Sequence, residues 1–132
     1  MRTLTTKDIA WLAGLIEGEG SFGLHRRTYP QIQLAMADED VVKRAAVLFD
    51  VSTTYCYPPS LQGYKPVWRC YVNGVKAVGW MMTLYSLLGS RRKTKVLEVL
   101  NFWKSRPKVD WREVGHRSWE TRQRNKLGAR HV

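Results

Sequence analysis

Hydrophobic and polar positions follow two different periods along the chain, and these periods divide it into strands and helices. Residues 31–37 (QIQLAMA) alternate polar and apolar side chains, which predicts a half-buried strand. Residues 94–103 (TKVLEVLNFW) instead place their large apolar side chains on one helical stripe. The remaining elements predicted in this way are a helix over 7–18, a strand over 21–28, a helix from about 38 to 49, strands over 51–57 and 67–72, and a helix over 74–88.

Residues that favour turns and helix starts separate these segments. Thr5 and Thr6 are candidates to cap the first helix, and Asp38 and Asn73 precede the next two. Tyr29-Pro30 predicts a turn or a strand edge, and Gly89-Ser90 breaks the helical pattern before the last helix. The resulting order is helix, strand, strand, helix, strand, strand, helix, helix, which is typical of an α+β domain.

The first helix ends in the segment WLAGLIEGEGSF, residues 11–22. Gly14 and Gly18 lie four residues apart on one helix face, where a second backbone can come close. Gly18 and Gly20 are expected to end the helix. Glu17 and Glu19 would diverge by about 200° on a continuing helix, so they do not form a pair within one chain. Glu19 is therefore expected at a helix end, beside a surface that another helix can touch.

Composition and charge narrow the class of partner. The chain has 132 residues, of which 44% are hydrophobic, enough for one compact domain with a real core. Its net charge is +11 and its pI is about 10.1. Residues 91–132 contain 13 Lys and Arg against 4 Asp and Glu, whereas residues 1–90 contain 9 against 7. This asymmetry favours a polyanionic partner, although a local charge run is also typical of a solvated helix face.

Other partners and compartments are less favoured. No apolar run is long enough to span a bilayer, and the N-terminus lacks the apolar core of a secretory signal. We therefore expect no membrane partner and a cytoplasmic, nucleoid or organellar location rather than secretion. Cys56 and Cys70 are expected to be reduced, buried thiols. The three histidines are scattered, without the spacing of a zinc site.

The segment at residues 12–22 resembles the signature of the LAGLIDADG homing endonucleases. Leu12-Ala13-Gly14-Leu15-Ile16 matches its first five letters, and Glu17-Gly18-Glu19-Gly20 stands where the signature has Asp-Ala-Asp-Gly. Taken alone, an amphipathic helix with a glycine cap explains the same residues. The order of elements, however, is the αββαββα arrangement of that family, over roughly residues 5–103. The resemblance implies an α+β fold with a four-stranded antiparallel saddle sheet per subunit. We expect a single domain over 1–103 and a basic extension over 104–132, helical or partly disordered.

The resemblance also implies an activity. Family members cut long DNA sites with divalent metal, and a chain with one motif acts on a pseudo-palindromic target as a homodimer. Glu19 would be the catalytic carboxylate and a metal ligand, and the Gly18 carbonyl a further ligand, with Glu replacing the Asp of the family name. We expect Mg²⁺ to support cleavage, Mn²⁺ to substitute for it, and Ca²⁺ to bind without supporting cleavage. The expected dimer-interface residues are Ala13, Gly14, Glu17 and Gly18, with Glu17 less favoured as a ligand.

Two further sets of residues follow from the same comparison. A basic residue expected just before the last helix, either Arg91 or Lys93, would assist catalysis. The alternative is that Arg91 and Arg92 only hold DNA phosphates. Asp40 or Glu39 stands where the family often orders solvent, although Asp38 to Asp40 also suit helix capping. Strand alternation places other residues on the face that would lie in the major groove, where Gln and Arg read base edges. These DNA-binding candidates are Ser21, His25, Arg27, Gln31, Gln33, Tyr55, Tyr57, Arg69 and Tyr71. Lys65, in the loop between Pro58 and Pro66, would reach the DNA at the outer end of the half-site.

Three functional readings remain open from the sequence. The first is the homodimeric endonuclease, acting in the copying of its own mobile intron or free-standing gene. The second is a catalytically silent protein of the same fold, either a DNA-binding regulator or an RNA-splicing maturase with RNA as its partner. The third is a structural nucleic-acid binder whose motif match is accidental. Glu19 and the basic residues at 91–93 favour the first reading.

Overall fold

The computed structural model describes residues 3–56, 66–106 and 119–125. The elements, in chain order, are α1 (Thr6–Glu19), β1 (Gly20–His25), β2 (Tyr29–Met36), α2 (Glu39–Phe49), β3 (Thr53–Cys56), β4 (Val67–Asn73), α3 (Gly74–Leu84), the 3₁₀ helix η1 (Tyr85–Leu87) and α4 (Ser90–Ser105). A further short helical segment covers 119–125. This is the αββαββα order with a following helix, so the predicted α+β fold is confirmed. No helix in these described ranges is long and apolar enough to cross a membrane.

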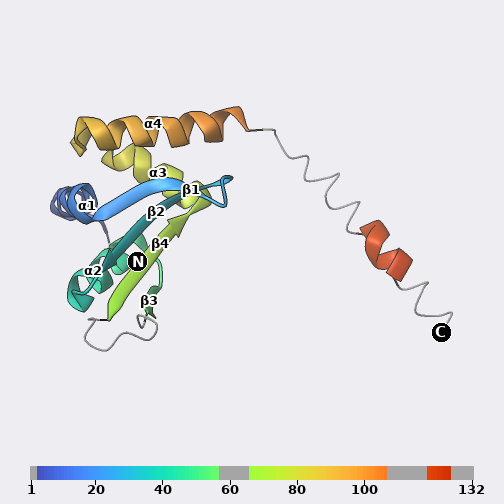
Figure 1. Cartoon of the computed structure of the whole chain (residues 1–132), viewed down its shortest axis with the longest axis horizontal. Helices are drawn as coiled ribbons and strands as arrows, with labels where there is room; N and C mark the ends of the chain where they lie inside the picture. The colour runs from blue at the N-terminus through green and yellow to red at the C-terminus, as the bar shows by residue number, and fades with distance from the viewer. Residues whose placement is uncertain (1–2, 57–65, 107–118, 126–132) are drawn as a thin grey trace.

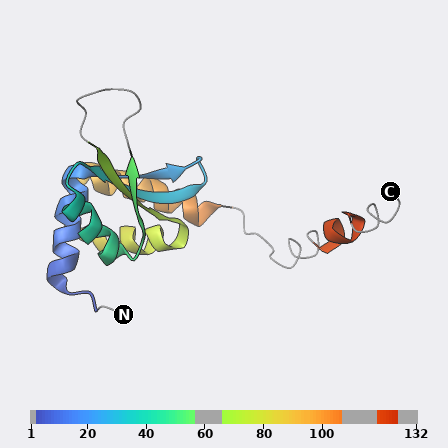
Figure 2. The ribbon, with the colours of Figure 1, turned by 90° about the horizontal axis from the view of Figure 1, so that it is seen from below.

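The four strands form one antiparallel sheet in the order β1-β2-β4-β3. Residues facing the helices alternate with residues on the open face, as the period of a strand requires. Figures 1 and 2 show α1 at one end of the sheet, where it leads directly into β1, and α4 running alongside β1. The helices cover the sheet face that carries Phe22, Ile32, Leu34, Cys70 and Val72, all buried. In the part of the chain that the structure describes, no helix covers the other face.

The core between helices and sheet is built from apolar side chains of every layer. Leu12 and Ile16 of α1 are fully buried. Phe49 at the end of α2 packs edge-on against Trp80 of α3, with ring centroids 5.0 Å apart. Burying one side chain of this size stabilises the fold by roughly 1.5–3 kcal/mol. Leu12 and Ile16 therefore hold α1 firmly against the rest of the domain.

Helix α1 begins as predicted but ends differently. Thr5 is the N-cap, and its side chain and that of Asp8 form a reciprocal capping box. Gly18 lies inside the helix, and Glu19 is its last residue. Gly20 follows in an extended conformation with φ −92°, so the helix does not end through a left-handed glycine. Glycine is needed there because a Cβ atom would come within 2.8–2.9 Å of Ile16.

The turn between β1 and β2 lies earlier than predicted. It is formed by 26–28, and Tyr29 and Pro30 already belong to β2, paired with His25 and Leu24. Pro30 is tolerated because it lies beyond the last pairing of β2 with β4, Gln31 with Asn73, where its missing N–H deprives no β4 carbonyl. Of the two expectations for Tyr29-Pro30, a turn or a strand edge, the structure therefore supports the strand edge.

The C-terminal helices also differ from expectation. α3 ends at Leu84, and a 3₁₀ turn replaces its predicted last residues. α4 begins at Ser90, with Gly89 as its N-cap, rather than at residue 94. Arg91 and Lys93 consequently lie within the first turn of α4 and not in a loop before it. Within the basic extension, residues 107–118 and 126–132 lie outside the described part.

Candidate active site and nucleic-acid interface

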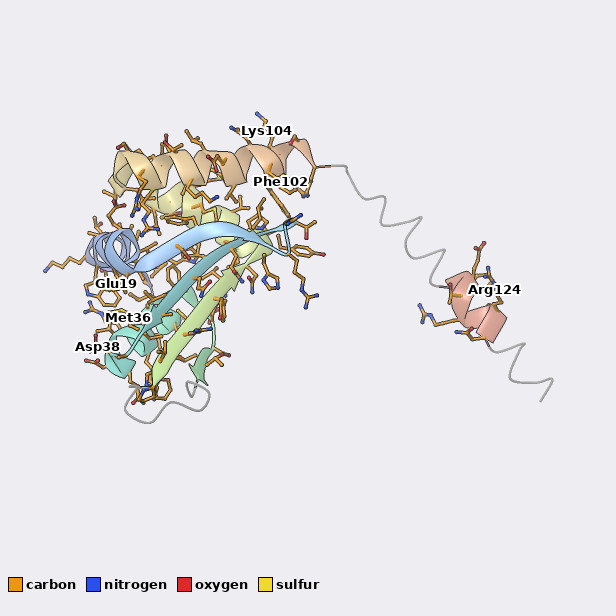
Figure 3. All side chains as sticks on the ribbon, in the orientation of Figure 1. Glu19, Met36, Asp38, Phe102, Lys104 and Arg124 are labelled. Atoms are coloured by element: carbon orange, nitrogen blue, oxygen red, sulfur yellow. The ribbon has the colours of Figure 1, made fainter. Side chains whose placement is uncertain are left out.

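Glu19 stands where α1 passes into β1. It is the last residue of the helix, it is exposed, and the next residue already pairs within the sheet. Figure 3 shows Glu19 at the same end of the sheet as Met36 and Asp38, in agreement with the pairing of Gly20 with Leu34. Carbonyls in the last turn of a helix have no intrahelical donor, so the Gly18 carbonyl offers a second oxygen beside the Glu19 carboxylate.

The neighbouring carboxylate, Glu17, points elsewhere. It accepts a hydrogen bond from the backbone N–H of Gly89, with an N···O distance of 3.1 Å. Gly89 is the N-cap of α4, and no side chain of its own caps that helix. Glu17 thus ties the end of α1 to the start of α4, and its carboxylate is engaged within the chain.

A cationic pocket of about 540 Å³ lies between β1 and the first turns of α4. Its lining residues are Phe22, Arg91, Arg92, Thr94, Lys95 and Glu98. Lys95 Nζ lies 3.4 Å from Glu98 Oε2, so that pair is partly neutralised. The Arg92 Nε atom is buried and has no hydrogen-bond partner within the described part of the chain. The pocket therefore presents two arginines, Arg91 and Arg92, beside a lysine and a glutamate that pair with each other.

The first turn of α4 is an unusual place for this charge. Backbone dipoles make the N-terminus of a helix positive, so cations there are unfavourable by a few tenths to about 1 kcal/mol each. α4 carries Arg91, Arg92 and Lys93 in this turn and no acidic residue. Lys93 differs from the other two because its Nζ lies 5.5 Å from the centre of the Tyr85 ring and it does not line the pocket. The arrangement is suited to an anion such as a phosphate, which would relieve the repulsion.

The open face of the sheet carries most of the predicted DNA-binding residues. Cross-strand pairs form rows on this face: Ser21, Gln33 and Tyr71; Gly23, Gln31 and Asn73; Ala35, Arg69 and Thr54. His25 is exposed at the end of β1. Arg27 lies in the hairpin turn rather than in β1, with positive φ like its neighbour Arg26.

One predicted position on the later strands, Tyr55, does not join these rows. Tyr55 is paired with Trp68, whereas Arg69 is paired with Thr54. Thr54 is therefore the β3 position in register with Arg69, and grouping Tyr55 with Arg69 and Tyr71 is wrong by one residue. Tyr57 and Lys65 lie outside the described residues. Asn73 was missed as a face residue, although alternation from Tyr71 places it there.

The expected interface and metal residues have distinct surroundings. Gly14 and Gly18 are exposed, and a Cβ built on either meets no described residue within 4 Å beyond the backbone of its own helix. Ala13, in contrast, is buried in the core of its own chain, so the open face of α1 does not include it. Among the described residues, no group of three or more His, Cys, Asp or Glu side chains could hold a metal ion. Of the two carboxylates in the last turn of α1, Glu17 is hydrogen-bonded within the chain and Glu19 is exposed.

Comparisons with known proteins support the fold. No family model matches the sequence, and no curated protein matches it. Among solved structures, the chain is similar to the I-LtrWI LAGLIDADG homing endonuclease bound to target DNA, with a TM-score of 0.55 and 18% sequence identity. The match covers 76% of this chain and 38% of that one, so the chain spans well under half of the neighbour's length. The chain has the fold of a LAGLIDADG homing endonuclease.

Proposed function

We propose that the protein is a metal-dependent, site-specific endonuclease that cuts double-stranded DNA as a homodimer. The observation that carries this proposal is the position of Glu19. Its exposed carboxylate ends α1, at the end of the sheet where the polar open face begins, and Glu17 ties the same helix end to the cationic start of α4. The I-LtrWI protein of the same fold has been crystallised with its target DNA, which favours DNA as the polyanion.

The residues present fit a hard divalent cation. Mg²⁺ prefers oxygen ligands, and the Glu19 carboxylate and the Gly18 carbonyl are both oxygen donors. Bound there, Mg²⁺ would supply an activated water and neutralise charge on the leaving oxygen. Mn²⁺ would replace it, and Ca²⁺ would support binding alone. Two oxygens from one chain are too few for an octahedral ion, so water, DNA phosphate and a second copy of the chain would complete the set.

A homodimer follows from the number of carboxylates. Cutting both strands of a duplex requires two reacting centres, and one chain offers one Glu19. Gly14 and Gly18 carry no side chain at their two positions on the exposed face of α1. The same face of a second copy can therefore pack closely there. Packing through α1 would bring the two Glu19 residues close to the two-fold axis, each near one strand of the DNA.

The cationic pocket and the sheet would divide the work of binding. Arg91 and Arg92 would hold backbone phosphates beside the reacting centre, which adds affinity without sequence information. Arg91 would also neutralise charge that develops on the phosphate during hydrolysis. The polar rows of the sheet would contact base edges, which supplies the choice of target.

The test is cleavage of a randomised duplex library in Mg²⁺, with Glu19→Gln as the matched variant and Ca²⁺ as the binding-only condition. We expect cut sites with two-fold-related halves, recovered with wild-type protein and absent with Glu19→Gln. The variant should still bind those sites, because its side chain keeps its size and loses only its charge. Full cleavage by Glu19→Gln would overturn the assignment of Glu19. Enrichment of bound DNA without any cleavage would overturn the endonuclease in favour of a regulator, and enrichment of RNA alone would favour a maturase.

A further inference from the structure

Asn73 occupies a helix-capping position but does not cap the helix. It ends β4 and precedes α3 as its N-cap, where an Asn side chain usually accepts a hydrogen bond from the backbone of the first turn. Here no such bond is made. Instead, Asn73 Oδ1 accepts a hydrogen bond from Gln31 Nε2 at 2.8 Å. The two residues are direct cross-strand partners on the open face, so this bond joins two amides side by side on that face.

The joined amides keep a defined set of free hydrogen-bonding groups. A carboxamide has two N–H donors and one oxygen acceptor. The bond between them uses one donor of Gln31 and one lone pair of Asn73. Both N–H groups of Asn73, the Oε1 atom of Gln31, the second N–H of Gln31 and the second lone pair of Asn73 Oδ1 remain, and no other hydrogen bond is formed by either side chain within the described residues. The pair therefore presents an acceptor and a donor next to each other, in an orientation that the bond between them fixes.

We propose that Gln31 and Asn73 act as one unit that reads a single adenine in each half of the DNA target. In the major groove, adenine offers the N7 acceptor next to an N6–H donor. Gln31 Oε1 would accept from N6, and Asn73 Nδ2 would donate to N7. Guanine presents two acceptors, O6 and N7, so the Gln31 oxygen would face another acceptor. This inference rests on the proposed function and specifies what the sheet recognises.

The residue on the other side of Gln31 leaves room for a base. Gly23 is its cross-strand partner on β1, and nothing lies within 4 Å of a Cβ built there. A glycine inside a strand often marks a place where a ligand comes close to the backbone. The row of Gly23, Gln31 and Asn73 therefore consists of a glycine with open space above it and two amides joined by a hydrogen bond.

The test is selection of bound duplexes from a randomised library in Ca²⁺, comparing wild-type protein with Gln31→Ala, Asn73→Ala and the double variant. We expect one adenine position in each half-site to lose its preference by roughly 5- to 150-fold in either single variant. The double variant should lose little more, because the residues act together. Gly23→Val should weaken the same position with little change in thermal unfolding, since a Cβ at Gly23 meets nothing within 4 Å among the described residues.

Gln33→Ala is the matched control, because Gln33 lies on the same strand and face one row away, opposite Tyr71. It should leave the adenine preference intact. Thermal unfolding of Asn73→Ala should also stay close to wild type, because Asn73 makes no cap bond. The inference is overturned if the two single variants change different positions, if the affected base is not adenine, or if all sequences weaken equally. If wild-type protein enriches no sequence at all, the proposed function fails first, and the inference fails with it.

Discussion

The Glu17 carboxylate accepts a hydrogen bond from the backbone N–H of Gly89, across 72 residues of sequence. This bond gives α4 the cap that its own sequence lacks. It also places a negative charge at the positive end of a helix whose first turn carries three cations. In the proposed enzyme, the same bond would hold the cationic turn of α4 beside the helix end that bears Glu19.

Breaking this bond should cost stability and activity together. Glu17→Ala is expected to lower the free energy of unfolding by about 1–2 kcal/mol, because a hydrogen bond to a charged group is lost at a helix end. Gly89→Ala should have a similar effect, since its Cβ would lie 2.8 Å from Glu17 Oε1 and push the carboxylate away. Urea unfolding of both single variants and the double variant measures the coupling. Fully additive losses would show that the two residues act independently.

The exposed glycines of α1 lead to a prediction about assembly. Gly14→Leu should leave the monomer folded, because nothing lies within 4 Å of the new Cβ, and should prevent close packing of two α1 helices. Gly79→Leu is the matched control, since Gly79 is also an exposed helical glycine with open space around it. Sedimentation equilibrium should show weakened dimers for Gly14→Leu alone. A dimer of unchanged strength would exclude the α1 face as the interface.

The periodic parts of the sequence were enough to predict the sheet and its open face. Alternation in QIQLAMA placed Gln31 and Gln33 opposite the buried Ile32 and Leu34, and the structure agrees. Alternation did not fix β3, because its predicted segment carries polar residues at both parities, such as Thr53 and Thr54. Only pairing with β4 sets the register of Thr54 and Tyr55.

Contacts between distant residues account for what the sequence did not predict. Cations in a first turn and the absence of a capping side chain argued against a helix start at Ser90, and the compensating group, Glu17, comes from another element. Asn73 was expected to cap α3, but its side chain bonds to Gln31, 42 residues away. In both cases, local preference was overridden by a tertiary hydrogen bond.

The choice between Arg91 and Lys93 can be made by experiment. Arg91 lines the cationic pocket, whereas Lys93 lies over the Tyr85 ring. We expect Arg91→Ala to lower the rate of DNA cleavage at saturating metal by about 10²- to 10³-fold, the loss typical of a group that stabilises developing charge. Lys93→Ala should leave the cleavage rate close to wild type and change stability by less than about 1 kcal/mol, because the lost cation–π contact opposes the relieved repulsion at the helix N-terminus. Single-turnover cleavage and thermal unfolding separate the two effects, and a greater loss of rate for Lys93→Ala would reverse the assignment.

Cys70 predicts a dependence of stability on alkaline pH. The thiol is free and buried in the core, and desolvation raises its pKa from 9.0 to about 11. The native state therefore holds this proton more tightly than the unfolded state does. The associated stability, of the order of 2–3 kcal/mol, is fully present below about pH 9 and is lost as the pH rises toward 11. Urea unfolding across this range should show a steeper decline for wild type than for Cys70→Ala, and parallel declines would contradict it.

The strained β1–β2 turn leads to a prediction about both stability and DNA binding: a variant with a relaxed turn should be more stable and bind DNA more weakly. Arg26 and Arg27 adopt φ angles of 51° and 61°, a conformation that is strained for residues other than glycine, Asn and Asp. Replacing them by Asn and Gly, the pair that suits a two-residue hairpin turn, should raise the free energy of unfolding by about 0.5–1 kcal/mol. The same variant should bind DNA more weakly. The slope of the logarithm of its binding constant against the logarithm of the salt concentration should become shallower, by an amount equal to up to about two phosphate contacts per chain.

A double lysine variant at the same two positions is the control for this last prediction, because it keeps both charges in the same strained turn. It should retain most of the salt dependence and gain no stability. Binding measured over a series of salt concentrations, beside urea unfolding, distinguishes the outcomes. If the Asn-Gly variant binds DNA with unchanged salt dependence, the turn does not contact phosphates, and the strain at Arg26 and Arg27 has no role in DNA binding.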